Sequence, residues 1–390
     1  MKLLSPQYRD RTPHSLGIVL LFLIVWWCRS LYTMPIESGG DAIIKLAYTA
    51  NSGMPFRSLL NNHHTMRWGA NLPGIAIHQI VGDRPSTYQV CTLIAFSLGF
   101  VLLTLASFHI LNWKMVAPFA LAMFMEPMMF RASTQFQPMV FGFVYVAATV
   151  LLAAEWCEHG NLRYLFGMMF FAFLPYGAHE AYVYFIPGFL AFIWLKSGKM
   201  EVLFALLVLA MLFCIEVLFF NLVSESELLL GRISALPRTH TPGATYGGSA
   251  YIDYFLMWTE ISWFDQFISI CALIPFWYYC IQRRLSSVPP MLILLSSMLT
   301  SYHLFNTFLI ADFNTFHTSQ PPFPKYLAIT MPFACLATFG WGAFFDSMLS
   351  KKTIGLVLSA SITIILISHT MLGIQPEYKH NGLRYPSKEA

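Results

Sequence analysis

The sequence predicts an all-α protein that crosses a membrane about eleven times, and three observations support this class. Of the 390 residues, 57% are apolar and only 11% are charged, too few to cover the surface of a water-soluble globule. Apolar runs long enough to cross a bilayer recur from residue 15 almost to the end. Basic residues cluster in the short loops between these runs. We therefore expect one multi-pass domain over residues 1–390.

The apolar runs and their polar flanks define the predicted spans. These cover residues 15–34, 87–111, 115–130, 137–154, 163–177, 181–195, 201–223, 262–281, 289–310, 326–346 and 353–374. The first run follows Lys2, Arg9 and Arg11 and has no small-residue cleavage site after it. It is therefore interpreted as a span and not as a removed signal peptide.

The positive-inside rule orients these spans. With a cytoplasmic N-terminus, every short loop on the cytoplasmic side is basic, and the residues concerned are Lys114, Arg163, Lys196, Lys199, Arg283, Arg284, Lys351 and Lys352. Residues 164–195 test the scheme, because they are too many for one span and contain Pro175, Gly177 and Pro187. Two spans with a turn at His179 keep every later basic loop on the cytoplasmic side.

The longer loops then face outward, and functional residues are expected there. They are the first outer loop at residues 35–86, the turn at His179, the second long outer loop at residues 224–262, residues 311–325 and the tail from residue 375. Within the first outer loop, the apolar residues of 41–49 suit a short amphipathic helix, and residues 69–81 are apolar but too short to span. We expect both segments to lie as helices along the membrane interface. The absence of Asn-x-Ser/Thr favours a bacterial envelope, with the protein in the inner (plasma) membrane.

Several polar residues on the outer side are candidates for function. Asp41 follows two glycines after the first span, where it either caps a helix or acts as a base. His179 and Glu180 form either an interfacial polar turn or a contact for substrate hydroxyls. Arg232 lies in a Gly- and Pro-containing loop that is either a solvated connector or a mobile lid. Glu126 and Glu216 lie within predicted spans, and the sequence assigns neither a role.

Three stretches resemble the GT-C superfamily of polyprenyl-phosphate-sugar-dependent glycosyltransferases. The first is Glu37-Ser-Gly-Gly-Asp41, soon after the first span. The second is His64-Thr-Met-Arg67-Trp-Gly69, leading to Leu72-Pro73-Gly74 before the second span. The third, Pro322-Phe-Pro324-Lys325-Tyr326, is similar to the entry of a late span in the mannosyl- and aminoarabinosyl-transferring branches, with Lys325 in place of the usual Arg.

The resemblance implies an inverting transfer of a sugar from a polyprenyl-phosphate donor to a glycan, lipid or protein acceptor, on the periplasmic or exterior face. Asp41 would be the base, and Lys325 would pair with the lipid phosphate. The substrate-binding residues expected alongside them are His64, Arg67, His179, Glu180, Arg232 and Tyr326. We expect no metal, no other cofactor and no nucleic-acid partner.

Two other functions fit the same outline. An O-antigen polymerase or ligase shares the spans and the lipid-phosphate chemistry but relies on outer-loop arginines, here Arg232 and Arg238. A transporter or flippase of lipid or sugar typically shows repeated halves and broken helices, and the sequence contains no recognisable repeat.

Overall fold

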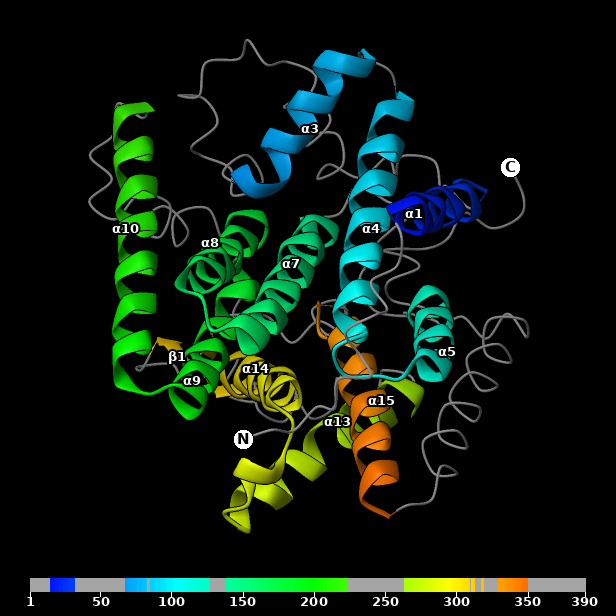
Figure 1. The fold of residues 1–390 in the computed structure, drawn as a ribbon. Coiled ribbons are helices and arrows are strands. Elements are labelled where there is room, and N and C mark those ends of the chain that lie inside the picture. Colours follow the sequence, from blue (N-terminus) through cyan, green and yellow to red (C-terminus); the bar gives the residue numbers. More distant parts are fainter. Residues whose placement is uncertain are drawn as a thin grey trace.

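A computed structural model of the chain describes residues 15–31, 67–82, 85–126, 138–223, 263–308, 310–312, 317–318 and 329–349. Within these ranges the structure is helical except for two short antiparallel strands, β1 (Ile310–Asp312) and β2 (His317–Thr318). Figure 1 shows the helices packed side by side in a bundle, with α3 inclined across one end. The predicted all-α class is confirmed for the described residues, and the small β-ribbon is an addition that the sequence did not predict.

The helices follow the predicted spans closely. They are α1 (Ser15–Ser30), α3 (Trp68–Val81), α4 (Pro85–Ser107), α5 (Trp113–Met125), α7 (Pro138–His159), α8 (Leu162–Ala178), α9 (Ile186–Lys196), α10 (Lys199–Val223), α13 (Trp263–Ile281), α14 (Pro290–Phe308) and α15 (Met331–Leu349), with the 3-10 helices η3 (Glu180–Phe185) and η4 (Leu285–Ser287). Each predicted span up to residue 346 lies on one of them. The last predicted span, 353–374, and the predicted interfacial segment 41–49 lie outside the described residues.

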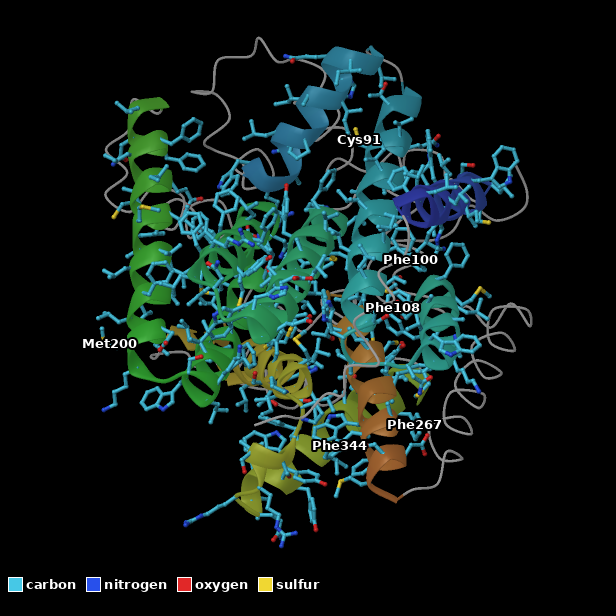
Figure 2. All side chains as sticks on the ribbon, in the orientation of Figure 1. Cys91, Phe100, Phe108, Met200, Phe267 and Phe344 are labelled. Atoms are coloured by element: carbon cyan, nitrogen blue, oxygen red, sulfur yellow. The ribbon has the colours of Figure 1, made fainter. Side chains whose placement is uncertain are left out.

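Three described helices, α4, α7 and α10, are long and apolar enough to cross a membrane. The apolar helices α1, α5, α8, α13 and α14 are shorter. Helix α10 is the most exposed of the three. Only 17% of its most apolar stretch is buried inside the protein, against 72% of the corresponding stretch in α4 and in α7. Its side chains, from Met200 onward, stand out from the bundle (Figure 2), and apolar residues such as Leu207, Ile215 and Leu222 are exposed. An apolar face of this length needs lipid to cover it, as in a helical membrane protein; eleven spans remain a prediction.

The basic residues around α7, α8 and α9 gather at one end of the bundle. Lys196, at the end of α9, donates a hydrogen bond from Nζ to the Trp156 carbonyl at 3.0 Å and lies 4.0 Å from the centre of the Trp156 ring. Residues 160–161 join α7 to α8 beside that site, where the Asn161 side chain caps α8. Helix α8 therefore begins where α9 ends, so the two run in opposite directions, as the predicted turn at His179 requires.

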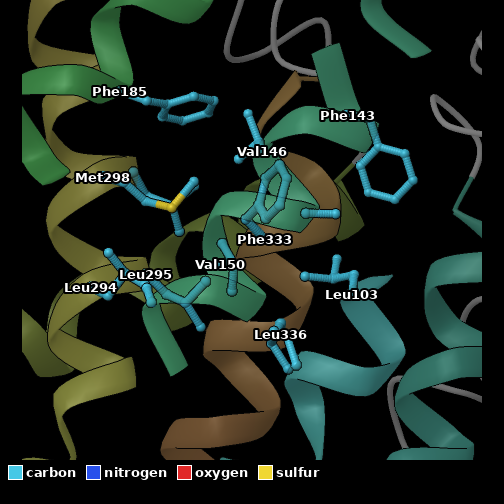
Figure 3. Close-up of a cluster of buried hydrophobic side chains, with 14 of the residues drawn as sticks. Leu103, Phe143, Val146, Val150, Phe185, Leu294, Leu295, Met298, Phe333 and Leu336 are labelled. Carbon is cyan, nitrogen blue, oxygen red and sulfur yellow. The ribbon is translucent and has the colours of Figure 1, made fainter. Parts of the chain in front are cut away.

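The opposite end of the bundle is organised around η3. The Tyr182 hydroxyl donates to the Met139 carbonyl at 2.6 Å, and the Ser301 hydroxyl donates to the Tyr184 carbonyl at 2.6 Å. These bonds attach η3 to the start of α7 and to the last two turns of α14. Below η3, side chains from α4, α7, α14 and α15 form the apolar core around Phe185 and Phe333 (Figure 3). The apolar core thus packs against η3 and helps to fix its position.

Helix α3 covers this end of the bundle instead of standing free of it. It packs against α4, α7 and α8 through the buried residues Gly69, Ala70, Asn71, Gly74 and His78. Its other side carries exposed apolar residues, among them Leu72 and Ile80. This two-sided character suits a helix at a membrane boundary, which is where the sequence predicted residues 69–81 to lie.

Candidate functional site

The structure brings together the described members of the predicted substrate site. Arg67, His179 and Glu180 meet at the end of the bundle that lies opposite Lys196. The remaining members, Asp41, His64, Arg232, Lys325 and Tyr326, lie outside the described residues.

His179 separates two helices and starts the second. Helix α8 ends at Ala178, and the His179 N–H donates to the Pro175 carbonyl at 2.9 Å. The His179 backbone is extended, with φ −154° and ψ 135°, and its Nδ1 accepts a hydrogen bond from the Ala181 N–H at 3.2 Å. A side chain that accepts from the N–H two residues later is an N-cap, so His179 initiates η3. This cap places Glu180 in the first turn of η3.

Glu180 forms a buried, side-on ion pair with Arg67. Arg67 Nη2 lies 3.1 Å from Oε2 and Nε lies 3.5 Å from Oε1, and each side chain is only 8% exposed. This two-point geometry is the strongest arrangement of a guanidinium and a carboxylate. Both oxygens of Glu180 face the guanidinium, so Glu180 is well placed to hold Arg67 and poorly placed to take a proton from an acceptor hydroxyl.

His179 also approaches Glu180, with Nδ1 3.7 Å from Oε2. That nitrogen already accepts the hydrogen bond from Ala181, and one ring nitrogen cannot accept one bond and donate another. The contact is therefore not a hydrogen bond. We assign His179 a capping role, with any proton of a neutral ring on Nε2.

Trp68, next to Arg67, is held by a second carboxylate. Its Nε1 donates to Oε1 of Glu216 at 2.7 Å, and its ring lies 6.1 Å from that of Phe173. Glu216 lies on α10 and is only 5% exposed. Sequence reasoning left Glu216 unassigned. The sequence does contain a signal for a polar contact here, because Glu216 is the only acidic residue between positions 202 and 223.

Gly69 completes the attachment of this segment. Its carbonyl accepts a hydrogen bond from the Tyr145 hydroxyl at 2.7 Å. A Cβ atom added to Gly69 would lie 2.6 Å from the backbone nitrogen of Ala178 and 2.7 Å from the carbonyl carbon of Gly177, so the two backbones touch there. Residues 67–69, hereafter the 67–69 clamp, are thus attached to η3, α10, α7 and α8.

Substitution of Gly69 by Ala is expected to lower the free energy of unfolding by about 1–3 kcal/mol, since the new methyl group meets backbone atoms that cannot rotate away. Thermal unfolding of the purified protein in detergent measures the change. Gly17→Ala is the matched control, because a Cβ at Gly17 on α1 has no neighbour within 4 Å. Equal unfolding temperatures for Gly69→Ala and wild type would contradict the close backbone contact.

A second buried basic residue lies where α1 approaches α5. The Arg29 guanidinium donates to the Phe124 carbonyl and lies 4.7 Å and 4.2 Å from the ring centres of Phe96 and Phe124. Glu126 ends α5 two residues later and is fully buried. Arg131, which follows Glu126 by five positions in the sequence, lies outside the described residues.

Among the described residues, no group of three or more His, Cys, Asp or Glu side chains is arranged to hold a metal ion. The expectation that no metal is needed remains a prediction from the chemistry of the lipid monophosphate.

Protein-family models, curated proteins and solved structures show no match to this chain.

Proposed function

We propose that the protein is a multi-pass membrane glycosyltransferase that moves a sugar from a polyprenyl-phosphate carrier to a glycan, lipid or protein acceptor on the non-cytoplasmic face. The observation that carries the proposal is the 67–69 clamp. It attaches the end of the predicted first outer loop, which contains Asp41, to the predicted outer turn at His179 and Glu180. Segments far apart in the sequence, each with a candidate residue, therefore share one end of the bundle.

The charge distribution supports the proposed orientation. Lys196 and Arg163 lie at the end of the bundle opposite the 67–69 clamp. Short basic loops face the cytoplasm in membrane proteins. The proposed site then faces the periplasm or the exterior of an inner (plasma) membrane, where lipid-linked sugars are presented. The predicted eleven-span topology with a cytoplasmic N-terminus is part of the same proposal.

The proposed chemistry is a single displacement. Asp41 takes the proton of the acceptor hydroxyl, and the oxygen attacks the anomeric carbon of the donor sugar. The bond between that carbon and the phosphate oxygen breaks, and the lipid phosphate leaves with the electron pair and binds Lys325. His64, Arg67, Arg232 and Tyr326 are proposed contacts to the substrates.

The test of the proposal is release of free polyprenyl phosphate. Purified protein in nanodiscs is mixed with a panel of polyprenyl-phospho-sugars and a crude envelope acceptor. We expect release from at least one donor, dependent on the acceptor. Empty nanodiscs are the control. No release from any donor by folded protein would overturn the proposal and favour the polymerase or transporter, and an essential role for Arg232 and Arg238 in polymer formation would then identify the polymerase.

A further inference from the structure

Two adjacent arginines, Arg283 and Arg284, follow the last residue of α13 in the turn that leads to α14. The course of α14 shows at which end of the bundle this turn lies. The Ser297 hydroxyl of α14 donates to the Gly188 carbonyl of α9 at 3.1 Å, and Ser301, one turn later, is bonded to η3. Helix α14 therefore runs from the end of α9 toward η3. The two arginines lie at the basic end of the bundle, opposite the 67–69 clamp.

Arg283 occupies a backbone position that glycine usually fills. Among the described residues it is the only one other than glycine with a positive φ, which is 54°. Its N–H donates to the Cys280 carbonyl at 3.0 Å, and the Arg284 N–H donates to the Tyr279 carbonyl at 2.9 Å. These two bonds form a Schellman motif, whose left-handed residue is commonly glycine because a Cβ is strained there. Arginine at this position therefore costs free energy that glycine would not.

The fold itself does not account for this arginine. A cation near the end of a helix interacts favourably with the helix dipole, but Arg284 already supplies one. Both arginines are exposed, and within the described ranges neither guanidinium makes a hydrogen bond, an ion pair or a ring contact. Lys196, by contrast, donates to a backbone carbonyl. The sequence also contains no acidic residue between Asp265 and Asp312, so no carboxylate of this hairpin offsets the two charges.

The turn lies where the exposed apolar side of α13 ends. Ile274 is 62% exposed, and Trp277 and Tyr278 are exposed in the next turn. On the other side of the helix, Tyr279 stacks on Trp341 of α15, so the exposed side faces away from the bundle. An apolar surface that ends in Trp and Tyr is typical of the boundary between hydrocarbon and lipid headgroups. The arginines just beyond this boundary lie at the level of the lipid phosphates.

We propose that Arg283 and Arg284 form a binding site for the phosphate of an anionic phospholipid in the adjacent leaflet. The N–H donors of a guanidinium match the geometry of phosphate oxygens. Two adjacent cations favour a headgroup with a net negative charge over a zwitterionic one, whose own ammonium group they repel. The bound lipid attaches the turn between α13 and α14 to the membrane surface. The site is independent of glycosyl transfer, because its ligand is a lipid of the bilayer and not the sugar donor.

A lipid titration tests the proposal. Delipidated protein in detergent is titrated with phosphatidylglycerol, or in parallel with zwitterionic phosphatidylcholine, and bound lipid is counted by native mass spectrometry. We expect wild type to bind phosphatidylglycerol more tightly than phosphatidylcholine. Arg283→Gly and Arg284→Gln should each weaken phosphatidylglycerol binding about fivefold, and the double variant about 25-fold, which is the loss expected for each cation beside an anionic headgroup.

The Arg283→Gly variant separates lipid binding from folding. Because glycine suits the left-handed position, we expect this variant to unfold at the same temperature as wild type or higher in phosphatidylcholine nanodiscs. Phosphatidylglycerol should then stabilise it less than it stabilises wild type. The control matched for total charge combines Lys114→Gln with Lys199→Gln, two exposed cations at the starts of α5 and α10. This control should bind phosphatidylglycerol within about twofold of wild type.

Four results would overturn the proposal. They are equal affinity of wild type for the two lipids, unchanged phosphatidylglycerol affinity in the double arginine variant, an equal loss of affinity in the double lysine control, and a lowered unfolding temperature of Arg283→Gly in phosphatidylcholine. The third would show attraction by total charge without a site, and the fourth would assign Arg283 to folding. None of them bears on the proposed transfer of sugar, and failure to release polyprenyl phosphate would leave the lipid site unaffected.

Discussion

Arg67→Met is expected to lower the free energy of unfolding by about 3–5 kcal/mol, because it removes the guanidinium that pairs with the buried Glu180 carboxylate. The pair is only 8% exposed on both sides, so water cannot replace the guanidinium without opening the end of the bundle. Denaturant or thermal unfolding in mixed micelles measures the loss. The change should also loosen the 67–69 clamp, since Arg67 is one of its three residues.

The double variant Arg67→Met with Glu180→Met tests the cause. The double variant also removes the buried carboxylate that lost its guanidinium partner, so we expect it to recover most of the lost stability. Arg163→Met is the matched control. Arg163 is exposed beside Tyr164, and its loss should change stability by no more than about 0.5 kcal/mol. A double variant as unstable as the sum of the two single variants would contradict a direct buried pair.

Asp41→Asn is expected to lower the turnover of lipid-linked donor by about 10²–10⁴-fold, the usual contribution of a general base. Asparagine has nearly the same shape as aspartate and caps helices equally well, so the variant should fold and insert like wild type. The measurement is initial rate of polyprenyl phosphate release at saturating donor and acceptor. The change therefore separates the base from the simple helix cap, the two interpretations that the sequence left open.

Glu37→Gln is the matched control, because Glu37 is the other carboxylate of the same short stretch. It should retain turnover close to wild type. If Asp41→Asn is as active as wild type, Asp41 is not the base. Glu180 would not then replace it readily, since both of its carboxylate oxygens face Arg67.

The helices and the break at His179 were predictable because each rests on local information. Apolar runs give the helix positions, and the basic loops required a turn between residues 177 and 181, where the structure places the cap of η3. The 3-10 geometry of residues 180–185 was not predictable, since it depends on the hydrogen bonds of Tyr182 and Tyr184 to α7 and α14.

The sequence alone could not predict which residues of the site contact one another. Arg67 and Glu180 were each predicted as site residues, but 113 positions separate them and no local pattern pairs them. The bond between Trp68 and Glu216 crosses 148 positions. Gly69 and Gly177 looked like ordinary glycines, and only the packed backbones show that a side chain does not fit there. The proposed roles of Asp41 and Lys325 still rest on resemblance alone.

The exposure of α10 has a consequence for how the protein is made. Only 17% of the apolar stretch of α10 is buried inside the protein, so this helix needs few protein neighbours to be stable in a bilayer. Glu216 is synthesised long after Trp68 emerges from the ribosome. Because proteins are synthesised at about 5–20 residues per second, several seconds or more pass between the synthesis of Trp68 and that of Glu216. We therefore expect the hydrogen bond between Trp68 and Glu216 to form only after α10 has been synthesised, which makes this attachment a late event in biogenesis.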